Sequence, residues 1–73
     1  MRRKDDVLQK FGSRVRKLRL QRSYSQDAFA SICGLDRTYV GGIERGERNI
    51  SLRNIEILAK AFDLSLADLL EGV

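Results

Sequence analysis

Apolar residues recur along the chain at the three- and four-residue steps of a helix face. Leu8, Phe11, Val15 and Leu18 form the first such stripe. This period predicts amphipathic helices, and capping residues and glycines divide the chain into five of them. The predicted helices cover about residues 5–22, 26–32, 36–45, 51–62 and 65–71. We therefore expect an all-α chain, a compact five-helix bundle, in which residues 1–73 form one domain and residues 1–4 a flexible basic arm.

Glycines interrupt two of the predicted helices. Gly12 lies within the first, where glycine costs about 1 kcal/mol relative to alanine. Gly41 and Gly42 are adjacent in the third, at about 2 kcal/mol for the pair. We interpret the pair as a place where this helix approaches DNA or a neighbouring helix closely. The alternative is tolerance of two glycines in a helix that packing holds together.

Basic residues are concentrated at the N-terminal end of the chain. Residues 1–22 hold nine Lys and Arg against two Asp, a net charge of +7, whereas the whole chain carries +4. A basic segment on an otherwise near-neutral domain favours a polyanionic partner, although a merely solvated helix face gives the same pattern. We predict that four side chains of the first helix project away from the core: Arg14, Arg16, Lys17 and Arg19.

The composition excludes several kinds of chemistry. The chain has no histidine and one cysteine, Cys33, which leaves no disulfide, no Cys/His zinc site and no histidine-based catalysis. No apolar run approaches the roughly 20 residues of a membrane span. We expect a cytoplasmic, non-enzymatic protein with no metal, no cofactor, no membrane association and no small-molecule ligand, in which Cys33 is a core residue.

Residues 26–44 have the spacing of a helix-turn-helix. Such a unit needs a small residue where its helices cross and a glycine at the turn, and Ala30 and Gly34 meet these needs. Apolar residues that hold the second helix of the unit against the first occupy the remaining positions: Phe29, Cys33, Leu35, Val40 and Ile43. Seven suitable residues in register predict a helix-turn-helix made by the second and third helices.

The stretch SQDAFASICGLDRTYVGGIERGERNIS resembles the helix-turn-helix of Xre-type, phage-repressor-like regulators. The resemblance extends over about residues 11–70, and GLDRTYVGGIERGERN is similar to the controller proteins of bacterial restriction–modification systems, which are small five-helix homodimers. It implies a sequence-specific transcriptional regulator that binds double-stranded DNA as a homodimer, on palindromic half-sites about 34 Å apart. It further implies a bacterial or phage protein at the nucleoid that binds its own promoter region. There it would activate with RNA polymerase as partner, and repress when a second dimer joins.

The resemblance also assigns roles within the major-groove interface. Arg37, at the start of the third helix, is expected to read guanine through its planar fork. The base-reading candidates are Arg37, Thr38, Tyr39 and Gln26, of which Gln26 has the alternative roles of contacting phosphate and of buttressing Arg37. The candidates for contacts with the DNA backbone are Arg48, Asn49, Ser25, Arg14, Arg16 and Lys17. Arg45 is expected to pair with an acid such as Glu44.

A homodimer needs an apolar face, and the end of the chain has more leucine than a short terminal helix requires. The predicted dimer interface consists of Ile57, Leu64, Leu66 and Leu69.

The sequence leaves three other functions open. A phage-like repressor is one, and a DNA-binding antitoxin is a second, although an antitoxin usually needs an extra segment for its toxin and this chain ends at Val73. A protein-interaction module of the same fold is the third, but it has no use for Arg37, Arg48 and the basic segment. An enzyme is the weakest alternative.

Overall fold

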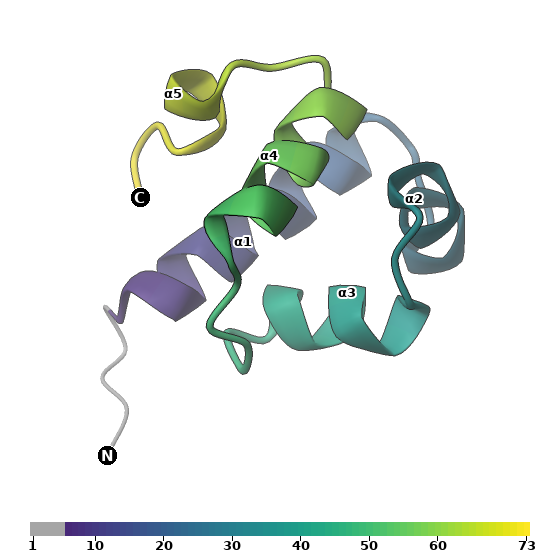
Figure 1. Cartoon of the computed structure of the whole chain (residues 1–73), viewed down its shortest axis with the longest axis horizontal. Coiled ribbons are helices and arrows are strands. Elements are labelled where there is room, and N and C mark those ends of the chain that lie inside the picture. Colours follow the sequence, from purple (N-terminus) through teal and green to yellow (C-terminus); the bar gives the residue numbers. More distant parts are fainter. Residues whose placement is uncertain (1–5) are drawn as a thin grey trace.

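A computed structural model describes residues 6–73, and these residues form five helices and no strand (Figure 1). The helices are α1 (Val7–Gln21), α2 (Gln26–Cys33), α3 (Arg37–Glu44), α4 (Leu52–Ala61) and α5 (Leu66–Leu69). The predicted all-α architecture is confirmed. The first helix begins two residues later than predicted and the last is a single turn. The predicted basic arm lies outside the described residues.

Each helix begins at a side chain that caps it. Asp6 accepts a hydrogen bond from the N–H of Leu8 at 2.7 Å, and Ser25 accepts one from the N–H of Ala28 at 3.0 Å. The three later helices are capped in the same way by Asp36, Ser51 and Ser65. These bonds satisfy amide groups that a helix leaves without an internal partner, which explains why the helices start where they do.

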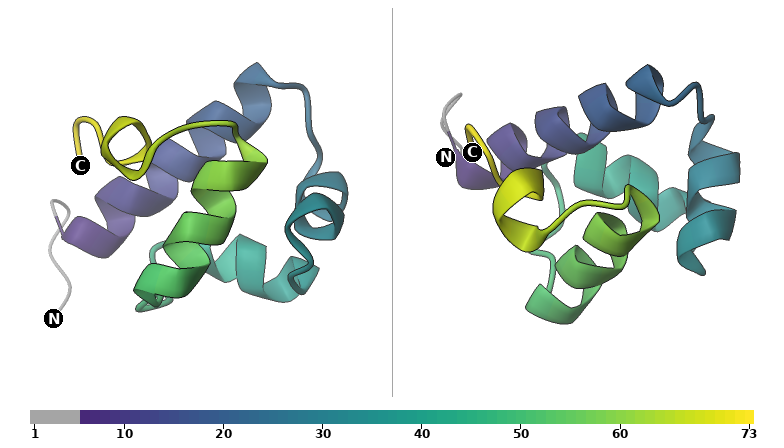
Figure 2. Two further views of the ribbon diagram at one scale, coloured as in Figure 1. Left: turned by 45° about the horizontal axis from the view of Figure 1, so that its top comes forward. Right: turned by 90° about the horizontal axis from the view of Figure 1, so that it is seen from above.

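The helices pack around one apolar core. The rings of Phe29 and Phe62 stack with centroids 4.5 Å apart, and Val15, Val40 and Leu58 are fully buried beside them. α1 packs on α3, α2 packs on α3 and α4, and α4 packs on α5. The C-terminal end of the chain lies near the first turn of α1 (Figure 2). α2 and α3 are joined at a steep angle (Figure 1), and Gly34 makes their turn with a left-handed φ of 69°.

Gly12 is the point at which α1 approaches the end of α3. A Cβ atom at this position would lie 2.6 Å from the carbonyl oxygen of Glu44 and closer still to that of Ile43. Both atoms belong to the backbone and cannot rotate away. The glycine that the sequence presented only as a cost to α1 is therefore required by the packing of α1 on α3.

Three arginines of α1 and its C-terminal cap bind other parts of the fold. Arg14 donates to the carbonyl oxygens of Leu69 and Asp68 at 3.0 and 2.7 Å, which ties α5 to α1. Arg22 donates to the carbonyl of Phe62 at 2.9 Å, at the end of α4. Arg19 is 5% exposed. The prediction that Arg14 and Arg19 project away from the core is wrong, because each side chain crosses to a partner on another element.

Leu69 is fully buried within the monomer. Its place in the predicted dimer interface is therefore wrong: α5 has only one turn, and the side of that turn that faces the core presents Leu69. Leu64 and Leu66 are half-buried against the same core, and Ile57 is half-buried on α4.

None of the helices in residues 6–73 combines the length and the apolar character needed to cross a bilayer.

Candidate nucleic-acid interface

Three of the four base-reading candidates lie around one shallow hollow at the N-terminal ends of α2 and α3. Gln26 contributes from α2 and Arg37 and Thr38 from the first turn of α3, with Gly41 and Arg45 completing the lining. Arg37 and Thr38 are exposed. The structure thus brings together residues separated by a helix and a turn, and it presents them at the end of α3 that the sequence predicted to face the bases.

Arg37 is held in place only loosely. Its Nε lies 3.3 Å from Oδ1 of Asp27 on α2, and both side chains are about two-thirds or more exposed, at 66% and 75%. An exposed ion pair of this kind contributes about 0–1 kcal/mol, so a stronger acceptor can replace the carboxylate. Asp27 was not singled out in the sequence, where nothing distinguishes it from other acidic residues in a first helical turn.

Gln26 is held by Glu44 and not by Arg37. Its Nε2 donates to Oε1 of Glu44 at 3.0 Å. The same carboxylate accepts from Nε and Nη2 of Arg19 at 2.6 and 3.0 Å, in a bidentate pair whose side chains are 7% and 3% exposed. The hydrogen bond to Glu44 raises the pKa of Arg19 above its ordinary value. Glu44 therefore links all three helices that build and support the interface, a role that sequence analysis missed.

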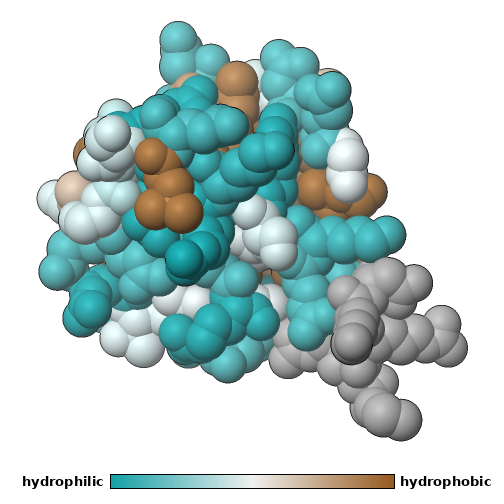
Figure 3. All heavy atoms as spheres, turned by 180° about the vertical axis from the view of Figure 1, so that it is seen from behind, coloured by the Kyte–Doolittle hydropathy of each residue, from teal (hydrophilic) through white to brown (hydrophobic). Residues whose placement is uncertain are grey.

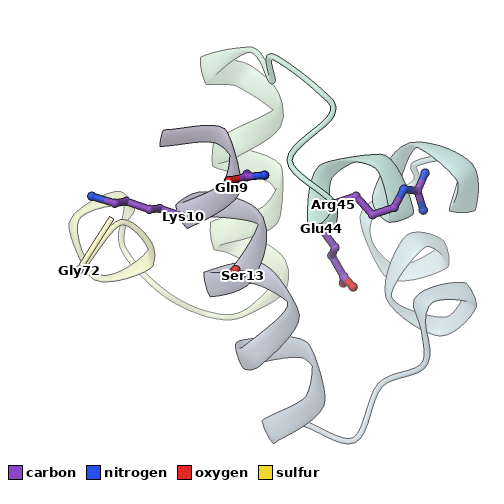
Figure 4. Close-up of a pocket in the computed structure, with 6 residues that line it drawn as sticks. All are labelled: Gln9, Lys10, Ser13, Glu44, Arg45 and Gly72. Carbon is purple, nitrogen blue, oxygen red and sulfur yellow. The ribbon is translucent and has the colours of Figure 1, made fainter. Parts of the chain in front are cut away.

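Arg45 has a different partner from the one predicted. Its Nε lies 3.0 Å from Oε2 of Glu47, and that hydrogen bond raises the pKa of Arg45. Figure 4 shows Glu44 and Arg45 pointing in different directions from the end of α3. The expected pairing of Arg45 with Glu44 itself is absent because Arg19 occupies that carboxylate.

The hollow in Figure 4 has a volume of about 470 Å³. It lies between α1, the end of α3 and Gly72. Lys10 and Arg45 extend to opposite sides of it in the figure, and Glu44 is already bonded to Arg19 and Gln26. Among residues 6–73 no three His, Cys, Asp or Glu side chains are grouped as metal ligands. Burial raises the pKa of the Cys33 thiol to about 11, so this half-buried side chain is a neutral thiol at physiological pH.

Tyr39 lies further along α3 and contacts two residues from outside that helix. Its hydroxyl oxygen accepts from Nδ2 of Asn54 at 3.1 Å, and Cζ of Arg48 lies 5.6 Å from its ring centroid. The adjacent glycines of α3 do permit a close approach, but of arginine side chains. A Cβ at Gly42 would lie 3.0 Å from Nε of Arg48, and one at Gly41 would lie 3.1 Å from Nη1 of Arg45.

The predicted contacts with the DNA backbone are spread over the molecule. Ser25 caps α2, and its hydroxyl proton remains able to donate while the oxygen accepts from Ala28. Asn49 and Arg48 are exposed in the connection after α3. Arg16 and Lys17 are exposed on α1, but Lys17 is five positions beyond Gly12 and so faces away from α3. Arg14 donates hydrogen bonds to α5 and is therefore no longer a candidate for contact with the DNA backbone.

The face seen in Figure 3 is mainly hydrophilic, and hydrophobic side chains form small separate patches on it.

Comparison with known proteins shows where the chain belongs. Residues 15–69 match the helix-turn-helix family. The chain is 50% identical over 62 residues to the control protein C.BamHI of Bacillus amyloliquefaciens, a match that covers 84% of this chain and 76% of that protein. The crystal structure of the restriction–modification controller protein C.AhdI from Aeromonas hydrophila has a TM-score of 0.82 and 53% identity, over 85% of this chain and 94% of that one. The controller protein C.Esp1396I, solved as a tetramer in complex with its natural 35 base-pair operator, has a TM-score of 0.79 and 33% identity, over 88% of each chain. The chain therefore belongs to the helix-turn-helix family and, within it, to the control proteins of restriction–modification systems.

Proposed function

We propose that this protein is a sequence-specific transcriptional regulator that binds a palindromic operator in double-stranded DNA as a homodimer and controls a restriction–modification system. The observation that carries the proposal is the exposed cluster of Gln26, Arg37 and Thr38 at the start of α3. The chain that carries this cluster is 50% identical over 62 residues to the control protein C.BamHI. The C.Esp1396I relative in complex with its operator supports an oligomer on DNA.

In this proposal α3 lies in the major groove. The guanidinium of Arg37 exchanges Asp27 for the O6 and N7 atoms of guanine, and Thr38 contacts the neighbouring base or phosphate. Gln26 approaches from α2 with its amide fixed by Glu44. Tyr39 reaches the edge of the groove, while Ser25, Arg16, Arg48 and Asn49 supply the contacts with the DNA backbone. Lys17 is left out of these contacts because it faces away from α3.

The remaining parts of the proposal rest on the similarity to control proteins. The protein acts in the bacterial cytoplasm, at the nucleoid, without catalysing a reaction. It regulates its own promoter, with RNA polymerase as the partner for activation.

Selection of bound duplexes from a random DNA pool at near-physiological salt tests the function. We expect the recovered sequences to contain two inverted half-sites about 34 Å apart, one helical turn of DNA. A pool with no common sequence would contradict specific recognition and would leave a basic surface that binds polyanions without reading them.

A substitution at Arg37 tests the base-reading assignment. Arg37→Ala should cost about 1–3 kcal/mol of discrimination at one base pair of each half-site, because a bidentate contact with guanine is lost. The comparison is Arg48→Ala, which should weaken binding to all sequences by a similar factor. Titrations against a panel of single-base operator variants measure both effects. Equal profiles for the two proteins would show that Arg37 does not read a base.

We propose that the second copy docks on the outer face of α4 and on Leu66. A shallow hollow there is lined by Leu52, Arg53, Glu56 and Leu66, and Leu52 is 70% exposed. Arg53 and Glu56 are exposed and lie three residues apart, so a twofold axis between two antiparallel α4 helices can place each arginine beside the partner's glutamate. Ile57 and Leu64, which are half-buried, complete the proposed interface.

Charge reversal tests that dimer. Arg53→Glu should weaken dimerisation at least about tenfold, because it places like charges opposite each other, and the exposed position leaves the monomer folded. The double variant Arg53→Glu/Glu56→Arg should restore the dimer by exchanging the two charges. Sedimentation equilibrium measures the masses. If Arg53→Glu leaves the dimer intact, the interface lies elsewhere on the molecule.

A further inference from the structure

Arg48 lies back across α3. The side chain comes from the connection that follows α3, and its Cγ and Nε would be 3.1 and 3.0 Å from a Cβ atom at Gly42. Its guanidinium carbon is 5.6 Å from the centroid of the Tyr39 ring. Gly42 and Tyr39 are three residues apart and share one face of the helix. Because Gly42 has no Cβ atom, the side chain of Arg48 can cross α3 at this position and reach the ring of Tyr39.

Tyr39 is itself fixed from the other side. Its hydroxyl oxygen accepts from Nδ2 of Asn54 at 3.1 Å, and both residues are half-buried. Asn54 belongs to the first turn of α4, where its own N–H donates to Oγ of Ser51 at 3.1 Å. The first turn of α4 therefore holds the ring over which the Arg48 guanidinium lies, so that one chain of contacts runs from α4 through α3 to the connection between them.

We propose that Gly42 and Asn54 are positioning residues, which hold Arg48 on Tyr39 in the orientation that binds a DNA phosphate beside α3. The proposal rests on the proposed function, since it requires α3 to contact DNA. The contact with the ring is a cation–π interaction at 5.6 Å, and it leaves N–H groups of the guanidinium able to donate to phosphate oxygens. An arginine ordered before binding avoids much of the rotamer entropy that a free arginine loses on contact with DNA.

Gly42→Ala is the direct test, because it separates DNA binding from folding. The new methyl group would lie 3.0 Å from Nε and 3.1 Å from Cγ of Arg48, so this side chain must shift off its place over Tyr39 by a few tenths of an ångström. Alanine is the better helix former, so the Tm should stay equal or rise. We expect affinity for the selected operator duplex to fall roughly fivefold, which reflects part of the rotamer entropy of an arginine. The slope of log affinity against log salt should decrease towards that of Arg48→Ala, which loses about one phosphate contact.

Gly41→Ala is the matched control. It makes the same exchange one residue earlier, but its methyl group meets Nη1 of Arg45 and not Arg48. The decisive comparison is made in an Arg48→Ala background. There Gly42→Ala and Asn54→Ala should have no further effect on affinity, because the side chain they position is gone. Gly41→Ala, which adds its methyl group in the hollow of Gln26 and Arg37, should change the affinity by the same factor with and without Arg48.

Two results would overturn the proposal: wild-type affinity for Gly42→Ala, or an unchanged effect of Gly42→Ala when Arg48 is absent. A contact with phosphate does not depend on sequence, so the same titrations on a duplex of random sequence test the positioning even if the selection recovers no operator. In that case the proposed function fails and the positioning of Arg48 is still decided by the salt slope.

Discussion

Gly12→Ala should remove about 3 kcal/mol or more from the free energy of unfolding, at the upper end of what overpacking costs. A Cβ at this position meets the carbonyl oxygens of Ile43 and Glu44, the nearer contact being with Ile43 and the other at 2.6 Å. This steric overlap can be relieved only if α1 and α3 move apart. A domain of this size has a total stability of roughly 4–11 kcal/mol, so the loss is a large part of it.

Urea denaturation followed by circular dichroism measures this effect. The control is Gly41→Ala, whose methyl group meets only the ends of the Arg45 and Gln26 side chains. That variant should be neutral or up to about 1 kcal/mol more stable, through its higher helix propensity. Similar midpoints for the two variants would contradict the close packing of α1 on α3 at Gly12.

The helix-turn-helix could be predicted because its determinants are local. The small residue Ala30, the turn residue Gly34 and the capping residues Ser25 and Asp36 act on neighbours within a few positions. Their spacing is therefore visible in the sequence. The positions of Arg37 and Thr38 in the first turn of α3 could be predicted for the same reason, because they follow directly from where α3 begins.

The basic residues of α1 and of its C-terminal cap, Arg22, could not be assigned in this way. Arg14, Arg19 and Arg22 have partners 55, 25 and 40 residues away along the chain. An excess of positive charge does not distinguish arginines that bind phosphate from arginines that bind the carbonyl groups at other helix ends. Part of the +7 of residues 1–22 therefore serves the fold.

The leucines of α5 illustrate a second limit. A helix of one turn has too few residues for periodicity to show which side faces the core. Leu66 and Leu69 were equivalent in the sequence, yet Leu69 is fully buried and Leu66 lines the outer hollow on α4. The packing of α5 depends on Arg14, whose contact with the end of α5 is invisible until the chain is folded.

The second large effect is expected at Glu44. Glu44→Leu leaves the guanidinium of Arg19 buried without a counter-charge, and removal of one partner from a buried ion pair costs about 3–5 kcal/mol. The control is Asp27→Ala, which breaks the exposed pair with Arg37 and should cost at most about 1 kcal/mol. Urea denaturation compares the two variants, and equal losses would show that burial does not decide the strength of these pairs.

The double variant Arg19→Met/Glu44→Leu separates the fold from the interface. It replaces the ion pair by apolar side chains and should recover most of the stability lost in Glu44→Leu, because no buried charge remains unpaired. Gln26, however, still lacks the carboxylate that accepts from its Nε2. The double variant should therefore still bind the operator several-fold more weakly than wild type, because loss of one hydrogen bond costs about 1 kcal/mol. If the double variant is stable and binds the operator with wild-type affinity, Glu44 stabilises the helices without positioning Gln26.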